Sequence, residues 1–338
     1  MIRASKPSIT DLEKKYLNEA IEAGDIGVGE FVGRFEEAWA HYNYKTYGVA
    51  CNSGTNALFL ALKALGIGEG DEVLVPEFTM AASAWCVSYT GATPVFVDCL
   101  DDLTIDYHLA RQKVTPKTKA VIAVPIYGRS VGQGFYDLAK EKGLFIIEDM
   151  AEAHGIKPKG DISCYSFYGN KILTTGEGGM CLTNDKRIAD EMRSLANMYF
   201  DKDRTLIHPK MGYNFRMTNI QASIGLAQVE RIGELLEKRH QVAKWYNEYI
   251  PEHYKMPERD VVWVYDIDCG LKQEEIKQKL FDAGVESRYF FKPMSQQPQY
   301  LDDYEQLEAY HWSKRGLYLP CHPELSEEEV KYICQILK

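Results

Sequence analysis

Residues 120–149, AVIAVPIYGRSVGQGFYDLAKEKGLFIIED, form the stretch from which the fold of this chain can be predicted. Its two ends, 120–125 and 144–149, are almost continuously apolar, which is typical of strands covered on both faces of a parallel sheet. The segment 134–142 between them is compatible with a helix. A strand, a helix and a second strand in this order predict a βαβ unit, and therefore an α/β protein.

The same alternation continues on both sides of this unit. Further strand-like runs occupy 73–76, 94–98, 161–168 and 180–183, and helix-compatible segments occupy 56–65 and 81–90. We therefore expect a doubly wound, mostly parallel central sheet with helices on both of its faces.

The pattern changes after this series. Residues 219–249 form one long, charged, amphipathic pattern that predicts a linking helix, which Pro251 ends. A smaller α+β region follows, with a strand expected at 261–267 and helices at 273–283 and 326–337. The expected organisation is a large domain over 1–235 and a small C-terminal domain over 236–338.

Composition excludes several classes of protein. The chain has 338 residues, of which 45% are hydrophobic and 26% charged, as in ordinary soluble domains. No run approaches the ~20 apolar residues of a membrane-spanning helix, and the charged N-terminal segment does not resemble a signal peptide, so we expect a cytoplasmic protein without a membrane partner. A net charge of −10 with no basic run argues against nucleic-acid binding. The eight cysteines show no C-x-x-C pair, so we expect reduced thiols and no metal site.

Polar residues that follow the predicted strands are the candidates for a site, because open α/β sheets bind ligands at the carboxyl ends of their strands. The turn 52–56, NSGTN, opens a helix and could bind a phosphate or simply cap that helix. Asp149 ends an apolar strand, where a buried charge needs a partner. That partner could be a structural cation or a protonated heterocycle nitrogen.

Two later segments also combine polar and turn-forming residues. Lys171 follows the run 161–168, and a lysine desolvated there could form a Schiff base, although a surface lysine is the simpler interpretation. The glycine-rich turn 176–179 and the segment 212–219 could likewise be an ordinary tight turn and a loop with a helix cap. The combination is more informative than its members. A phosphate-type helix start, a carboxylate and a lysine are the three groups that pyridoxal 5'-phosphate requires.

Five motifs together resemble the DegT/DnrJ/EryC1/StrS family of nucleotide-sugar aminotransferases, which has the aspartate aminotransferase fold. They are SGTNAL at 53–58, GATPVFVD at 91–98, ED with AHG at 148–155, GNK with TGEGG at 169–179, and GYNFRMT at 212–218. The resemblance covers nearly the whole chain. It implies the fold type I architecture of pyridoxal-phosphate enzymes, with a mostly parallel sheet and a smaller C-terminal domain.

The resemblance also implies roles for single residues. Lys171 stands at the position of the Schiff-base lysine, and Asp149 at that of the partner of the pyridine nitrogen. Gly54, Thr55 and Ser166 match the groups that bind the cofactor phosphate. Asn214 matches a residue that reaches this phosphate from the other subunit, which implies a homodimer with shared active sites.

A narrower subgroup is indicated by a few positions. Glu152, in the cofactor-binding region, is usually acidic in members that act on GDP-linked 4-keto-6-deoxymannose. Met80 stands where many relatives place an aromatic ring against the cofactor. The residues expected to contact the substrate are His208, Tyr213 and Arg288.

The implied reaction uses glutamate to aminate the C4 ketone of a nucleotide-linked 4-keto-6-deoxy sugar, giving a 4-amino-4,6-dideoxy sugar such as GDP-perosamine. The alternatives are the same reaction on a dTDP- or UDP-linked sugar, a sugar dehydratase, and a non-catalytic regulator that binds the cofactor. The related dehydratases have histidine in place of the lysine, so Lys171 favours amino transfer.

Overall fold

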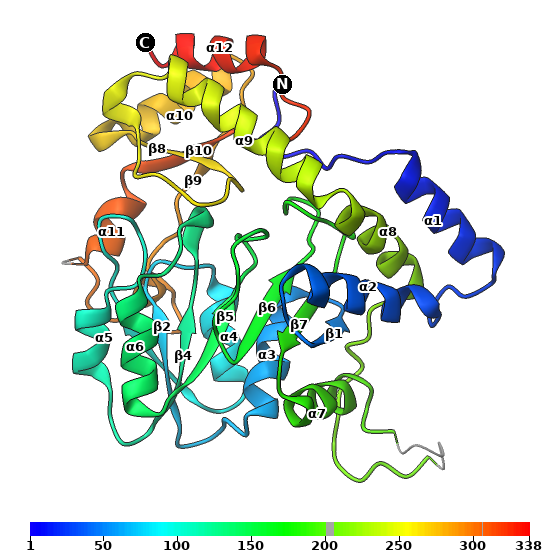
Figure 1. The fold of residues 1–338 in the computed structure, drawn as a ribbon. Helices are drawn as coiled ribbons and strands as arrows, with labels where there is room; N and C mark the ends of the chain where they lie inside the picture. The colour runs from blue at the N-terminus through cyan, green and yellow to red at the C-terminus, as the bar shows by residue number, and fades with distance from the viewer. Residues whose placement is uncertain (201–205, 306) are drawn as a thin grey trace.

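A seven-stranded sheet forms the centre of the larger body in the computed structural model, which describes residues 1–200, 206–305 and 307–338 (Figure 1). Its strand order is β1-β7-β6-β5-β4-β2-β3, and only β7 runs antiparallel to its neighbours. The strands are β1 (Tyr47–Cys51), β2 (Glu72–Pro76), β3 (Thr93–Val97), β4 (Thr118–Ala123), β5 (Phe145–Asp149), β6 (Ile162–Ser166) and β7 (Gly179–Thr183). The predicted mostly parallel sheet is confirmed.

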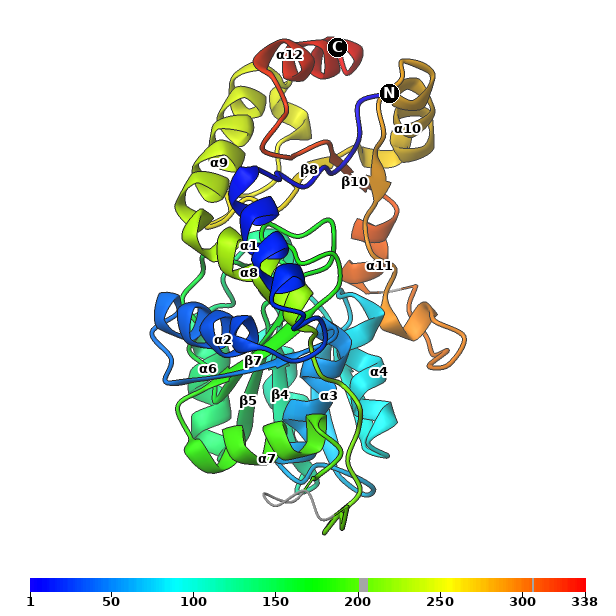
Figure 2. The same cartoon turned by 90° about the vertical axis from the view of Figure 1, so that its right-hand side faces the viewer.

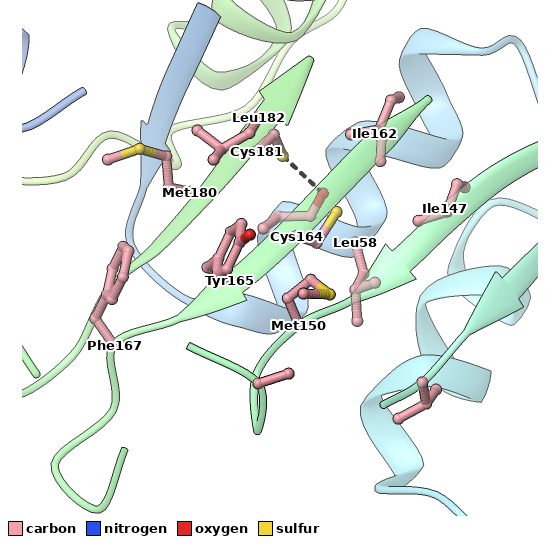
Figure 3. Close-up of a cluster of buried hydrophobic side chains, with 14 of the residues drawn as sticks. Leu58, Ile147, Met150, Ile162, Cys164, Tyr165, Phe167, Met180, Cys181 and Leu182 are labelled. Atoms are coloured by element: carbon pink, nitrogen blue, oxygen red, sulfur yellow. Dashed lines mark hydrogen bonds between the residues drawn. The ribbon is translucent and has the colours of Figure 1, made fainter. Parts of the chain in front are cut away.

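Helices cover both faces of this sheet (Figure 1). One face carries α3 (Gly54–Ala64), α4 (Ala81–Tyr89) and α7 (Lys186–Ala196), and the other carries α2 (Glu30–Tyr42), α5 (Tyr107–Lys113) and α6 (Gln133–Lys142). On the second face, Trp39 of α2 packs edge-on against Tyr165, with ring centroids 5.1 Å apart. Figure 3 shows part of the resulting core, where apolar side chains of β5, β6 and β7 meet Leu58 of α3. The apolar strands of the sequence are therefore buried from both sides, as predicted.

A three-stranded antiparallel sheet forms the centre of the smaller body. Its order is β8 (Tyr265–Asp268), β10 (Gly316–Leu319), β9 (Arg288–Tyr289). Around it lie α9 (Ile232–Tyr249), α10 (Gln273–Asp282), α11 (Glu308–Ser313) and α12 (Glu327–Ile336). The N-terminal residues join this body, since Ile2 pairs with Val285 (Figure 2). The proposed domain boundary at residue 235 falls within α9.

The predicted long helix over 219–249 is two helices. They are α8 (Asn219–Glu230) and α9, and the chain bends between them at Arg231, whose φ is −104° and ψ 6°. The Arg231 guanidinium pairs with Glu13 of α1 (Asp11–Glu22) at 2.6 Å, so the bend is fixed by a contact distant in sequence. α8 is largely buried between α1 and α2. The charged residues that follow it continue the amphipathic pattern, so the sequence did not indicate that this first half is buried.

The two helices expected in the C-terminal region are present as α10 and α12, whereas β9, β10 and α11 were not expected from the sequence. The capping box between Ser326 and Glu329 starts α12 as predicted. The strand expected at 261–267 begins only at Tyr265, and residues 261–264 are buried without belonging to a strand. None of the helices in the described part of the chain has the length and apolar character needed to cross a bilayer.

Candidate active site

A cavity of about 360 Å³ lies at the carboxyl ends of β2, β4, β5 and β6, where the smaller body meets the sheet. Its volume is within the range of small-molecule sites. The large body contributes the N-terminus of α3 and the loops after the strands, and the smaller body contributes aromatic rings. The lining residues used below are Gly54, Thr55, Met80, Asp149, Glu152, Ser166, Tyr168, Asn170, Lys171, Glu177, Trp263, Phe291 and Tyr318.

The start of α3 forms a cradle that only glycine can build. Ser53 caps the helix by accepting a hydrogen bond from the Asn56 amide at 3.2 Å. A Cβ on Gly54 would lie 2.6 Å from the Ser166 Cβ, so a side chain there would collide with the end of β6. The first N–H groups of a helix have no partner within the helix, and they attract anions. This cradle fits a phosphate group.

Asp149 presents a carboxylate at the end of β5. Its side chain is 6% exposed, and it accepts hydrogen bonds from Ser83 Oγ at 2.7 Å and from the Ala151 amide at 3.2 Å. Burial raises the pKa of Asp149, whereas the Ser83 hydrogen bond and the charge of Lys171 lower it. A cationic group in the cavity would therefore stabilise the ionised carboxylate, and a protonated pyridine nitrogen is such a group.

Lys171 follows β6 and lines the same cavity. Its side chain is half-buried, and burial lowers its pKa, while the negative charges of Glu152 and Asp149 raise it. The Nζ atom lies 4.0 Å from the centroid of the Trp263 ring. A desolvated amine with a lowered pKa is more often uncharged, which is the form that attacks an aldehyde.

Glu152 is the second carboxylate of the cavity, and it is 5% exposed. Its Oε2 accepts a hydrogen bond from the Tyr127 amide at 2.9 Å. Burial raises the pKa of Glu152 to about 7, and the charge of Lys171 opposes this effect. At neutral pH this carboxyl can therefore either donate or accept a proton.

The raised pKa of Glu152 predicts a pH-dependent stability difference. A carboxyl with a higher pKa in the folded state binds more protons folded than unfolded, so its contribution to stability falls as pH rises from about 4.5 to about 7. A glutamine at this position would resemble the neutral acid at every pH. We expect E152Q, without cofactor, to match the wild type near pH 5 and to be more stable by roughly 1–3 kcal/mol at pH 8. Urea unfolding at both values measures this, and a pH-independent difference would contradict it.

The cavity brings together the predicted cofactor residues of this chain, except for Asn214. Gly54, Thr55, Met80, Asp149, Glu152, Ser166 and Lys171 all line it. Asn214 is exposed and pairs through its backbone with Asn197, outside the cavity.

The three residues expected to contact the substrate also lie outside this cavity. Arg288 lines an adjoining space of about 330 Å³, which shares Tyr168, Asn170, Trp263 and Tyr318 with the first, and it forms an ion pair with Glu286. Tyr213 stacks on Phe215 with ring centroids 4.9 Å apart, and the exposed His208 ring forms a hydrogen bond with the Met198 carbonyl.

Sequence reasoning missed Ser83, Trp263 and Tyr318 as parts of this site. Ser83 lies in the first turn of α4, and its position beside Asp149 follows only from the packing of that helix on the sheet. Trp263 and Tyr318 come from the smaller body. Trp263 lies in the apolar run 261–267, where a strand was expected, and Tyr318 lies in β10, which was not expected. Only the presence of large aromatic residues in these short segments could have drawn attention to them.

The arrangement fits pyridoxal phosphate. A phosphate-type cradle, a buried carboxylate and a desolvated amine surround one cavity, and each has the chemistry that a different part of this cofactor needs. With this sheet, they define a pyridoxal-phosphate-dependent enzyme of the aminotransferase class. The chain belongs to the DegT/DnrJ/EryC1/StrS aminotransferase family, whose sequence model matches residues 7–338.

Individual relatives agree with this assignment. The chain is 40% identical to a GDP-perosamine synthase of Escherichia coli, covering 98% of this chain and 96% of the relative. It is 39% identical to a protein of the same name from Caulobacter vibrioides, covering 99% and 97%. A protein of Streptococcus pneumoniae solved in a PLP form matches with a TM-score of 0.91 and 28% identity, covering 99% and 97%. An aminotransferase of this family from Brucella abortus gives a TM-score of 0.90 at 29% identity, covering 97% and 94%.

Proposed function

We propose that this protein transfers the amino group of glutamate to the C4 ketone of GDP-linked 4-keto-6-deoxymannose, giving GDP-perosamine. The observation that carries the proposal is Lys171 in one cavity with Asp149 and Glu152, in a chain 40% identical to a GDP-perosamine synthase. A lysine at this position supports amino transfer over the dehydratase alternative. The charge of −10 gives no support to a non-catalytic, cofactor-binding regulator that acts on nucleic acid.

The residues of the cavity divide the work of this reaction. Pyridoxal phosphate, when bound, supplies a ring that accepts the electron pair left on a substrate carbon. Asp149 would keep the ring nitrogen protonated, because a buried carboxylate favours the charged form of a cation beside it. The amine of Lys171 takes a proton from the substrate carbon as a general base and returns it as a general acid. The N–H groups of Gly54 and Thr55 would hold the phosphate.

The smaller body excludes water from the reacting atoms. Trp263 is 4% exposed, and Phe291 and Tyr318 are partly buried beside it along the cavity. A wall of aromatic rings lowers the local dielectric, which strengthens the interaction of Lys171 with the two carboxylates. Arg288, in the adjoining space, is placed to attract an anionic nucleotide, and we assign it and the exposed His208 to substrate binding.

The working unit in this proposal is a homodimer in which each site uses residues of both chains. Asn214 is exposed on this chain and lies away from its own cavity, so it is available to a second copy. In that copy it would complete the phosphate site formed by the start of α3. We also place the enzyme in the cytosol, where its eight buried cysteines would remain reduced.

Shared sites predict complementation between two defective variants. K171A lacks the amine, and N214D would place a negative charge beside the phosphate in the partner's site. Random pairing makes about half of the dimers mixed, each with one intact site, so co-expression should recover about one quarter of the wild-type rate. Sites built from single chains would give only the average of the two parent rates, which would refute the shared site.

The substrate is tested by offering GDP-, dTDP- and UDP-linked 4-keto-6-deoxy sugars side by side, with glutamate as donor. We expect the GDP compound to be the best acceptor, with formation of an amino sugar measured by mass spectrometry. A dTDP or UDP compound as the best acceptor would replace the nucleotide assignment. Release of ammonia with a 3-deoxy product would identify a dehydratase, and binding of the cofactor without turnover of any sugar would favour the regulator.

A further inference from the structure

The backbone around Lys171 is attached to side chains from distant parts of the chain. The indole Nε1 of Trp263 donates to the Asn170 carbonyl at 2.9 Å. The Arg239 guanidinium on α9 donates to the Lys171 carbonyl at 3.4 Å, and the Leu173 amide donates to Nδ1 of the buried His154 at 3.2 Å. Three closely spaced contacts therefore fix the segment that presents the amine.

Trp263 is the one of these residues that also faces the amine. Its ring centroid lies 4.0 Å from Lys171 Nζ, which is a cation–π distance. Its own carbonyl accepts a hydrogen bond from Arg239 Nη1 at 2.7 Å, and the same guanidinium reaches the Lys171 carbonyl. The indole nitrogen and the carbonyl of Trp263 are therefore both connected to the segment of Lys171, the second through Arg239. These contacts hold the ring beside the amine.

The face of an aromatic ring attracts an ammonium group through the ring quadrupole. A neutral amine carries no positive charge and lacks this attraction. The other titratable groups that line the cavity are Asp149, Glu152, Tyr168, Glu177 and Tyr318. The two buried carboxylates attract the ammonium from the β5 side, and the indole does so from the side of the smaller body. Burial disfavours the charged form and opposes both effects.

We propose that Trp263 is a positioning residue that holds the ammonium form of Lys171 against the cavity wall whenever the amine is not bonded to the cofactor. In turnover the ammonium forms when the released lysine has taken the substrate proton, and the contact would then keep it next to the reacting carbon until it returns the proton; that part rests on the proposed function. The contact itself is a property of the protein without cofactor.

The test measures the titration of Lys171 in cofactor-free protein. The rate at which acetic anhydride labels Lys171 is followed against pH by mass spectrometry in the wild type, W263F, W263L and W245F. Leucine keeps the surroundings apolar but removes the aromatic face, so the apparent pKa of Lys171 should fall by about one pH unit, giving about tenfold more reactive amine near neutral pH. The apparent pKa of Lys171 in W263F should lie between its values in the wild type and in W263L. Trp245 packs on the smaller body, and its variant should titrate like the wild type.

An unchanged or raised pKa of Lys171 in W263L would overturn the proposal. If Trp263 served only packing, W263L would lower the melting temperature without lowering this pKa. If W263L does not fold, W263F decides by the same criterion. Because the experiment needs neither cofactor nor sugar, failure of every nucleotide sugar as an acceptor would leave its outcome intact. The two proposals can therefore fail separately.

Discussion

Replacement of Lys171 by alanine is expected to reduce transamination by at least about 10³-fold. Proton transfer by a positioned group contributes roughly 10²- to 10⁴-fold by itself, and the alanine variant also loses the covalent attachment of the cofactor. The half-buried amine makes no structural salt bridge within the described residues, so its loss should leave the fold unchanged. The measurements are the rate of amino-sugar formation, the yellow absorbance of the bound cofactor and the melting temperature.

Lys45 provides a matched control for this experiment. It is also half-buried, its pKa is also lowered by burial, and its Nζ donates to the Gly160 carbonyl at 2.8 Å, away from the cavity. K45A should keep the wild-type rate per folded molecule even if it melts earlier. If K171A reacts at the parental rate, or if K45A loses as much activity as K171A, Lys171 is not the catalytic amine.

The parts of the fold that are determined by local pattern could be predicted from the sequence. The apolar runs 120–125 and 144–149 became β4 and β5, because a strand covered on both faces has no polar side to interrupt it. The same logic located Asp149 and Lys171, since both follow strands whose carboxyl ends meet at one edge of the sheet. Gly54 could also be predicted as part of the site, because the turn that opens a helix is recognisable in the local sequence.

Contacts between distant segments could not be predicted in this way. The bend at Arg231 depends on Glu13, more than two hundred positions away, and no local signal marks it. Trp263 lies in an apolar run with the composition of a strand, yet its indole donates to the Asn170 carbonyl and the strand starts two residues later. Residues of the smaller body enter the site through the way the two bodies pack, which hydrophobic periodicity does not encode.

Replacement of Asp149 by asparagine is the second change with a large expected effect. It should lower the rate of transamination, whereas the stability of the cofactor-free protein should be maintained or increased. D149N can still accept the Ala151 amide through its Oδ1, and its Nδ2 can donate to Ser83 Oγ, because a hydroxyl also accepts, so the geometry of the wall should survive. It cannot supply the negative charge that favours a protonated ring nitrogen. A neighbouring carboxylate raises the pKa of such a cation by roughly 1–3 units, so transamination should fall by about 10²-fold, within a range of roughly 10- to 10³-fold.

The stability of cofactor-free D149N should move the other way. Burial raises the pKa of Asp149 above its ordinary value of 3.8, so ionisation of this carboxyl destabilises the folded state as pH rises above about 4. Removing the charge should therefore leave the apoprotein as stable as the wild type at pH 7, or more stable. Urea unfolding at pH 5 and pH 7.5 measures the difference, which should grow with pH.

Glu148 supplies the contrast that makes this result interpretable. It precedes Asp149 on β5, is also buried, and accepts hydrogen bonds from Tyr136 and Ser163 on the side away from the cavity. E148Q should lower stability and preserve the rate per folded molecule, which is the reverse of the pattern expected for D149N. If both variants lose stability and activity in parallel, the charge of Asp149 stabilises the fold and does not act in catalysis. Another residue would then have to pair with the ring nitrogen.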